Sequence, residues 1–112
     1  MQRVCFQLQV DPTRLDEYTT RHAAVWPPML RAIEASGRRN YSLFLRADGL
    51  LIGYYETDDD GAAQRSLNDN PDTAEWEAQM APFFVSLDGR PDQAAPRLFE
   101  IFHLEDQLTA LD

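Results

Sequence analysis

One long helical pattern near the N-terminus sets the strongest limit on how this chain can fold. Asp11-Pro12 is typical of a helix start, and Gly37 is typical of a helix end. Pro27 and Pro28 lie inside the pattern and predict a kink or break after Val25. At about 100° per residue, six side chains share an arc of about 100°. They are Leu15, Tyr18, His22, Trp26, Met29 and Ile33.

The rest of the chain alternates polar and apolar residues in a way that predicts strands. Asp48-Gly49 separates two such segments and predicts a hairpin with a type I′ turn. The predicted strands are residues 3–10, 40–47, 50–57 and 97–104.

Two short helices complete the pattern, at residues 58–69 and 73–80, with Asn70-Pro71 between them. Residues 82–96 are rich in turn signals, and we expect them to be partly ordered or to cover another part of the molecule. The order of elements is βαββαβ, which predicts a ferredoxin-like α+β fold. The length of 112 residues fits a single domain. We expect residues 105–112 to form a loose tail.

The hairpin and the last strand are apolar on both faces. Tyr41 and Leu43 alternate with Phe44, and Phe99 alternates with Leu98. Two helices cover only one face of a four-stranded sheet, so the other face needs a second cover. We therefore predict a homodimer in which the two sheets face each other.

The composition argues against several classes of partner. The net charge is −9 and the pI is near 4.5, whereas nucleic acids and anionic membrane surfaces attract basic patches. No apolar run approaches the ~18 residues of a membrane span, and residues 1–10 do not form the apolar core of a signal peptide. A single cysteine permits no disulfide within the chain. We predict a cytoplasmic protein that binds neither nucleic acid nor membrane.

A titratable pair lies in the middle of the apolar helix face. Tyr18 and His22 are four residues apart, so their side chains are neighbours, and Trp26 continues the row. Imidazole titrates near neutrality and can act as acid or base. The alternative is a core histidine bonded to a backbone carbonyl.

Two further aromatic residues are candidates for a pocket wall. Tyr41 begins the second strand and could converge on His22, while Trp76 lies on the second short helix. Both could equally be core residues. His103 and His22 make a poor metal set, because the chain has no His-x-x-x-His and no cysteine pair. We predict neither a metal nor a cofactor.

Together these residues resemble the L-rhamnose mutarotase family over nearly the whole chain. The spacing of tyrosine, histidine, Trp-Pro and Asn-Tyr carries the resemblance. The matching residues are Val10-Asp-Pro12, Glu17-Tyr18, Arg21-His22, Val25-Trp26-Pro27, Gly37, Asn40-Tyr41, Glu75-Trp76, Met80 and the segment 98–104.

The resemblance implies a dimeric α+β barrel and a cofactor-free enzyme that interconverts the α and β anomers of L-rhamnopyranose. It implies that His22 is the catalytic acid and that Tyr18, Tyr41 and Trp76 bind the sugar. We add Trp26 as a substrate-binding candidate. Where the family has a second tryptophan directly after the first, this chain has Glu77, which leaves the preferred sugar open.

Mutarotation needs an acid and a base but no oxidant. Our hypothesis is that His22 delivers a proton to the ring oxygen, with the base unassigned. Two other functions use similar features. One is a cofactor-free dimeric α+β barrel monooxygenase, and the other is a small-molecule-binding module without catalysis.

Overall fold

The computed structural model describes residues 1–87 and 89–111, and it contains a four-stranded antiparallel sheet. The strands are β1 (Gln2–Gln9), β2 (Arg39–Leu45), β3 (Leu50–Thr57) and β4 (Arg97–Leu98). Their order across the sheet is β2-β3-β1-β4. Strand β1 pairs with β3 along its whole length, from Gln2↔Thr57 to Gln9↔Leu50. This order confirms the predicted ferredoxin-like fold.

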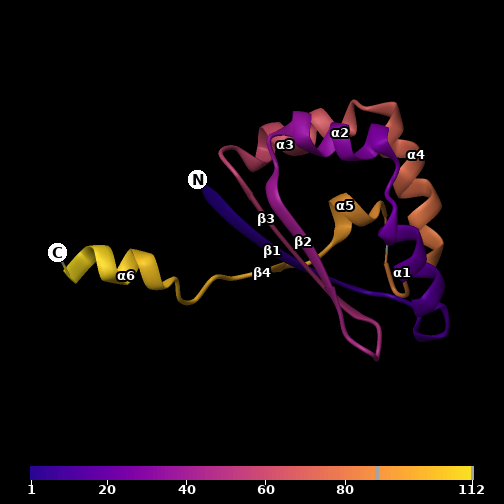
Figure 1. The fold of residues 1–112 in the computed structure, drawn as a ribbon, viewed down its shortest axis with the longest axis horizontal. Helices are drawn as coiled ribbons and strands as arrows, with labels where there is room; N and C mark the ends of the chain where they lie inside the picture. Colours follow the sequence, from indigo (N-terminus) through magenta and orange to yellow (C-terminus); the bar gives the residue numbers. More distant parts are fainter. Residues whose placement is uncertain (88, 112) are drawn as a thin grey trace.

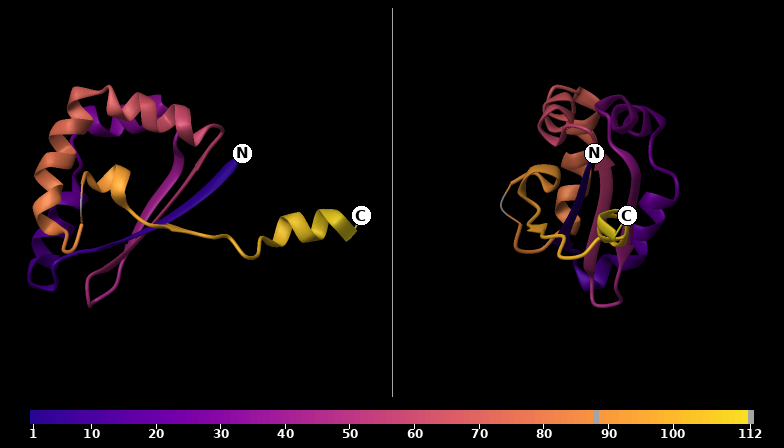
Figure 2. Two further views of the ribbon diagram at one scale, coloured as in Figure 1. Left: turned by 180° about the vertical axis from the view of Figure 1, so that it is seen from behind. Right: turned by 90° about the vertical axis from the view of Figure 1, so that its left-hand side faces the viewer.

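The main helices lie over one face of the sheet (Figure 1). The helices α1, α2, α3 and α4 form an arch above the strands, and the segment that returns to β4 passes beneath it (Figure 2). The helical elements are η1 (Pro12–Arg14), α1 (Leu15–Ala23), α2 (Pro27–Ser36), α3 (Asp60–Asn68), α4 (Pro71–Met80), η2 (Ala81–Phe83), α5 (Pro91–Ala94) and α6 (Leu104–Leu111).

The long predicted helix is divided in two, as the prolines indicate. Helix α1 ends at Ala23, and Pro27 is the first residue of α2, a position where its missing N–H costs nothing. Gly37 ends α2 in the left-handed conformation, with φ of 95°. The break lets the two halves of one apolar face approach the sheet from different directions.

The core lies between the helices and the helix-facing side of the sheet. Alternate residues of β1 and β3 are buried there, including Phe6, Leu8, Leu51 and Tyr55. Gly53 faces the same way, and a Cβ built at Gly53 would collide with the Phe6 ring. The glycine therefore lets Phe6 lie across β3 and form part of the floor of the interior.

The hairpin between β2 and β3 differs from the predicted type I′ turn. That turn needs positive φ at both central residues, yet Gly49 has φ of 95° and Asp48 is not among the residues with positive φ. The N–H of Gly49 donates to the Arg46 carbonyl at 2.9 Å, so Ala47 and Asp48 are the central residues. The Asp48 carboxylate accepts hydrogen bonds from the Arg46 side chain at 2.6 and 2.8 Å and from the Leu50 N–H at 3.2 Å, which favours this turn.

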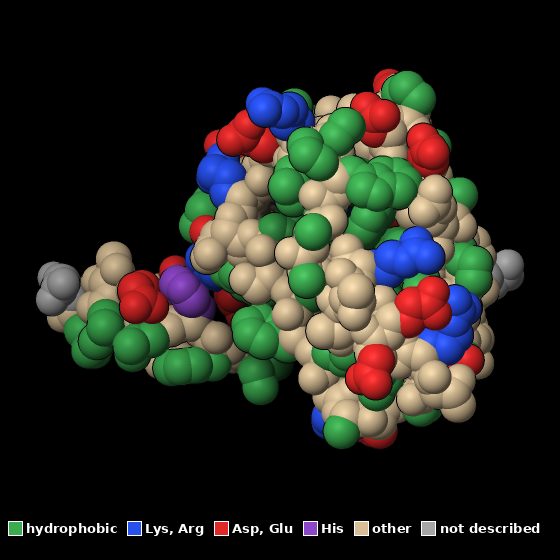
Figure 3. All heavy atoms as spheres, turned by 45° about the vertical axis from the view of Figure 1, so that its right-hand side comes forward, with side chains coloured by type: hydrophobic (Ala, Val, Ile, Leu, Met, Phe, Trp, Pro, Cys, Tyr) green, Lys and Arg blue, Asp and Glu red, His purple; other side chains and the backbone are tan. Residues whose placement is uncertain are grey.

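The C-terminal end departs most from the prediction. The strand predicted at 97–104 is only two residues long, and residues 99–103 pair with no described strand. The loose tail predicted at 105–112 is instead mostly the helix α6, with residue 112 outside the described residues. We call residues 99–111 the C-terminal arm, which projects away from the body (Figures 1 and 3).

The C-terminal arm leaves its apolar side chains uncovered. Phe99 and Ile101 are each 95% exposed, although both belong to an alternating strand-like pattern. Arg3 holds the base of the arm through Glu100 at 2.8 Å and Asp106 at 3.0 Å. The alternation alone did not determine strand length, because pairing also depends on what covers the strand.

The predicted connection at 82–96 covers the interior, and its residue 88 lies outside the described residues. The N–H of Asp11 donates to the Phe83 carbonyl at 2.7 Å, and the N–H of Gln7 donates to the Pro96 carbonyl at 3.0 Å. These bonds anchor both ends of the segment to β1 and its extension, with α5 between them. Among the described helices, none is long and apolar enough to cross a membrane.

Candidate active site

A cavity of about 440 Å³ opens between the helices and the sheet. Its volume falls within the range of about 300–1,000 Å³ that is typical of small-molecule sites. The wall is mostly apolar, with a few polar groups. The polar and aromatic side chains that line it include Tyr18, His22, Tyr41, Trp76, Glu77 and Asp92.

The first wall is formed by α1 and β2. Tyr18 and His22 lie one turn apart on α1, and their rings are 4.3 Å apart at an angle of 31°. Tyr18 is buried and is held on its other side by the edges of Phe83 and Phe84. This packing fixes the ring of His22 in one orientation at the cavity surface.

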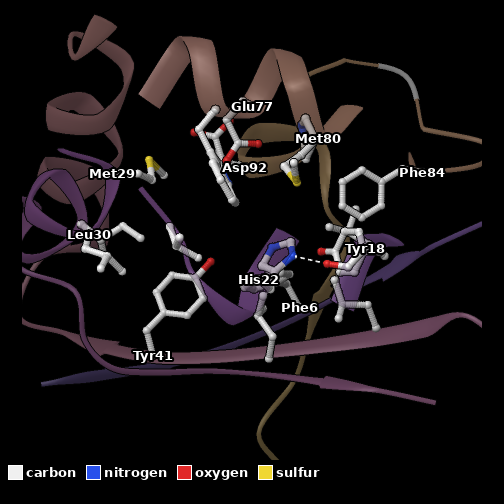
Figure 4. A pocket seen from close by; sticks show the side chains of 17 residues that line it. Phe6, Tyr18, His22, Met29, Leu30, Tyr41, Glu77, Met80, Phe84 and Asp92 are labelled. Carbon is white, nitrogen blue, oxygen red and sulfur yellow. Dashed lines mark hydrogen bonds between the residues drawn. The ribbon is translucent and has the colours of Figure 1, made fainter. Parts of the chain in front are cut away.

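The hydrogen bond of His22 determines which of its nitrogens is free. Its Nδ1 lies 2.9 Å from the backbone oxygen of Tyr18, as the dashed line in Figure 4 marks. A carbonyl oxygen only accepts, so Nδ1 carries the proton and donates it. Burial lowers the pKa of His22, and the bond to Tyr18 offsets part of that effect. A neutral His22 therefore leaves the lone pair on Nε2 free to accept a proton.

Tyr41 adds a second hydroxyl to the first wall. Its ring stacks on Tyr55 at 5.2 Å and meets the edge of Phe6. Figure 4 shows its hydroxyl pointing into the cavity. Burial raises the pKa of both Tyr18 and Tyr41, so both hydroxyls stay protonated near neutral pH and can donate or accept hydrogen bonds.

The two tryptophans lie together, but they differ in their relation to the cavity. Trp76 lines the cavity and meets His22 edge to face, with ring centres 5.5 Å apart. Trp26 does not line it, and packs instead against Trp76, with ring centres 5.1 Å apart. The structure therefore places four of the five predicted site residues at the cavity surface, namely Tyr18, His22, Tyr41 and Trp76. The fifth, Trp26, lies behind Trp76.

The second wall carries two carboxyl groups that the sequence did not indicate as site residues. Glu77 is 8% exposed, and the Asp92 side chain is also 8% exposed. The sequence marks Glu77 only as a departure from the family pattern, because helix periodicity places it beside Trp76 without showing what it faces. No sequence signal indicated Asp92, since the path of the segment 82–96 brings it to the cavity.

The two carboxyl groups differ in their surroundings. Burial and the charge of Asp92 raise the pKa of Glu77 to about 7, against smaller opposite effects of Arg90, the Asp92 backbone N–H and Arg38. Asp92 itself is paired with Arg90 through two bonds of 2.6 Å. The site thus combines a neutral imidazole with a carboxyl group that titrates near neutrality.

His103, the second histidine, lies away from this site. It is on the C-terminal arm, where its Nδ1 is 3.4 Å from Asp106. Within residues 1–87 and 89–111, no group of three or more His, Cys, Asp or Glu side chains is placed to hold a metal ion.

The model of one protein family matches residues 3–104, nearly the whole chain. That family is described as L-rhamnose mutarotase. The chain belongs to the L-rhamnose mutarotase family.

Two family members with curated names match over their whole length. The L-rhamnose mutarotase of Burkholderia orbicola is 34% identical over 108 residues, covering 94% of this chain and 100% of the relative. The L-rhamnose mutarotase of Bacillus subtilis is 33% identical over 107 residues, with the same coverage.

Solved structures support the family's fold. The crystal structure of an L-rhamnose mutarotase from Formosa agariphila superposes with a TM-score of 0.75 at 21% identity, covering 93% of this chain and 99% of that one. Tetracenomycin F2 cyclase from Streptomyces glaucescens, a polyketide cyclase, superposes with a TM-score of 0.59 at 19% identity, covering 92% of this chain and 98% of that one. The same fold thus occurs in enzymes with different chemistry, so the fold alone does not assign an activity.

Proposed function

We propose that this protein is a mutarotase that interconverts the α and β anomers of L-rhamnopyranose or a related 6-deoxy or L-sugar. Family membership supports the substrate class. The observation that carries the proposal is the neutral His22 at the cavity surface, with Nε2 free and two tyrosine hydroxyls nearby. Such a site can exchange protons with a sugar at neutral pH.

The reaction sets clear demands on the site. The bond between C1 and the ring oxygen breaks, the ring oxygen gains a proton, and the anomeric hydroxyl loses one. The open aldehyde then rotates and closes on its other face, with both transfers reversed. An acid and a base that exchange roles therefore suffice, and a positioned pair contributes about 10²–10⁴-fold. This is adequate because free sugars already mutarotate slowly in water.

The remaining residues hold the sugar. Trp76 offers a flat apolar ring for the C–H face of a pyranose, and Tyr18 and Tyr41 offer hydroxyls for its polar groups. Trp26 supports the Trp76 ring from behind and acts on binding through it. We propose that no metal or cofactor takes part, because a positioned acid and base suffice for both proton transfers and the reaction consumes neither oxidant nor reductant.

Saturation-transfer proton NMR on L-rhamnose tests the proposal directly. We expect purified protein to accelerate exchange between the anomeric signals over buffer, and His22→Ala to lose that acceleration. A folded wild-type protein that leaves the exchange rate at the buffer value would contradict a mutarotase function. L-fucose, L-lyxose and L-mannose in the same assay would then rank the sugars.

The two alternative functions predict different results. A cofactor-free monooxygenase would consume oxygen with a phenolic or quinone-like substrate, and a binding module would bind sugar tightly without exchanging its anomers. Family membership does not favour either function. An oxygen electrode and calorimetric binding, run on the same sample, distinguish both from a mutarotase.

We also propose that the protein is a cytoplasmic homodimer. The C-terminal arm leaves Phe99, Ile101 and Phe102 uncovered, and the face of the sheet away from the helices exposes Phe44 and Leu98. A second copy that packs against this face and receives the arm would bury both surfaces. Sedimentation equilibrium should give twice the monomer mass, and a monomer at all concentrations would contradict this. The single cysteine is consistent with a reducing compartment.

A further inference from the structure

Glu77 is a buried carboxyl group of the cavity whose only partner within residues 1–87 and 89–111 is the Asp92 backbone N–H. It follows Trp76 on α4 and contributes to the cavity lining. In Figure 4, Glu77 and Asp92 lie on the opposite side of the cavity from His22 and Tyr41. A sugar bound between these walls would therefore meet His22 on one side and a carboxyl group on the other.

The Asp92 carboxylate is already hydrogen-bonded to neighbouring side chains. Its carboxylate accepts both bonds from the Arg90 guanidinium and a third from Gln64 at 3.1 Å. Glu77 forms no such ion pair with any residue in 1–87 or 89–111. Of the two carboxyl groups, Glu77 is therefore the one available to a ligand.

Charged and titratable groups on every side of the cavity influence Glu77. Arg38, which precedes β2, and Arg90, which precedes α5, favour its ionised form, while Asp92 disfavours it. The charge of Glu77 in turn helps to raise the pKa of Tyr18 on α1 and of Tyr41 on β2, so both hydroxyls lie within its field. Burial outweighs the two arginines, so a substantial fraction of Glu77 is protonated near neutral pH.

We propose that Glu77 is the second proton-transfer group of the site, donating its proton to the ring oxygen while His22 Nε2 takes the proton of the anomeric hydroxyl. This assignment rests on the proposed mutarotase function. It follows from the hydrogen bond of Nδ1, which makes a neutral His22 an acceptor at the start of ring opening. The sequence analysis left the base unassigned and gave the role of acid to His22. The proposal makes His22 the base and Glu77 the acid.

The proposed step is balanced without an outside reactant. As the C1–O5 bond breaks, its electron pair goes to O5, which takes the Glu77 proton. The O1–H proton goes to His22 Nε2, and the O–H electrons complete the C1=O1 double bond. The enzyme then holds a Glu77 carboxylate and a His22 imidazolium. Closure on the other face of C1 returns the proton of O5 to Glu77 and the proton of His22 to O1.

The test compares the anomer-exchange rates of wild type and Glu77→Gln over pH 5 to 9, with L-rhamnose in saturation-transfer NMR. Glutamine keeps the size of the side chain but has no proton to transfer. We expect Glu77→Gln to lose about 10²-fold or more in rate. The wild-type rate should fall as pH rises past about 7, as Glu77 loses its proton, and this fall should be absent from the residual rate of the variant.

Glu75→Gln is the matched control, since it removes the same charge from an exposed position of the same helix. We expect it to keep the wild-type rate and pH profile. An unchanged rate and pH profile in Glu77→Gln, with an active wild type, would overturn the assignment while leaving the mutarotase function in place. An inactive wild type would instead overturn the proposed function.

A direct titration covers the case in which Glu77→Gln fails to fold. Carbon-13 NMR of the glutamate side-chain carboxyl groups, in wild-type protein with and without L-rhamnose, follows the Glu77 signal. A midpoint near 7 that shifts when sugar binds supports the proposal. A midpoint near the ordinary 4.5 would overturn it, because the group would then hold no proton to donate at neutral pH.

Discussion

The two walls of the cavity use different means to place their polar groups. On the first wall, His22 is fixed by its own helix, through the ring of Tyr18 and the Tyr18 carbonyl four residues earlier. On the second wall, Asp92 comes from a distant segment and is held by Arg90 and Gln64. The first arrangement is local, whereas the second combines a local bond from Arg90 with a bond from Gln64, which is distant in the sequence.

This difference affects the charge of the polar groups on each wall. Burial alone suppresses the charge of His22, since the Tyr18 carbonyl partly opposes that effect and no carboxylate pairs with the ring among the described residues. On the second wall, the Asp92 carboxylate is paired with the Arg90 guanidinium, whereas burial raises the pKa of Glu77, which forms no ion pair among the described residues. Each wall thus keeps one group close to neutral, and each of these groups can exchange a proton with a ligand.

The largest expected effect comes from the first wall. His22→Ala should reduce the anomer-exchange rate by about 10²–10⁴-fold, because it removes the group that exchanges protons with the sugar. The fold should survive, since the Tyr18 carbonyl that His22 contacts is in the same helix. Saturation-transfer NMR and circular dichroism measure the two effects. His103→Ala is the matched control and should keep full activity. A folded His22→Ala variant with the wild-type rate would show that His22, on the first wall, takes no part in the mechanism.

The second wall predicts a pH dependence of stability. The pKa of Glu77 is raised from 4.5 to about 7, so the folded protein binds more protons than the unfolded chain between these values. Its contribution to stability therefore falls as pH rises from about 4.5 to 7 and is constant above that range. As the pH is raised from 4 to 8, the free energy of unfolding of Glu77→Gln should therefore increase by about 3 kcal/mol relative to that of wild type. Urea unfolding at several pH values measures this gain, and a constant difference would indicate an ordinary pKa.

The contribution of the Arg90–Asp92 ion pair to stability should depend on its burial in the second wall. Arg90→Met leaves the Asp92 carboxylate buried without its cation, and we expect a loss of about 2 kcal/mol in the free energy of unfolding. Arg46→Met is the matched control, because Arg46 and Asp48 form the same two-bond geometry on the exposed hairpin. That exposed pair should contribute little. Equal losses in the two variants would show that burial does not distinguish them.

The smallest expected effect concerns sugar binding by the tryptophans. Trp76→Leu keeps an apolar side chain but loses the flat ring, so KM should rise about tenfold while kcat changes less. Trp26→Leu should raise KM less, because Trp26 contacts Trp76 rather than the cavity. Steady-state NMR or polarimetric rates at several sugar concentrations give both constants. A pure kcat defect in Trp76→Leu would contradict the stacking role.

The local features of the fold followed from the sequence. Asp11-Pro12, Pro27 and Gly37 marked the helix ends, because each has few conformations available or forms specific bonds. The hairpin was found, but its turn type was wrong, since the side-chain bonds of Asp48 favour a different turn. The last strand was too long in the prediction, because residues 99–103 have the alternating pattern without a partner strand among the described residues.

In the candidate site, too, local features were predictable from the sequence and features that depend on packing were not. Tyr18 and His22 were predictable as neighbours because helix geometry fixes the spacing of residues four positions apart. That Tyr41 and Trp76 face His22, and that Trp26 does not line the cavity, depends on how three separate elements pack. The role of Glu77 was hidden for the same reason, since its pKa depends on burial and on charges from other segments.

By itself, the sequence determined the order of the elements, the helix breaks and the pairing of His22 with Tyr18, because these depend on backbone geometry over a few residues. The tertiary structure decided that the segment 82–96 brings Asp92 to the cavity and that Glu77 is buried near it. It also decided that the arm leaves the sheet. These features depend on desolvation and on contacts between residues far apart in the chain, and no local pattern encodes either.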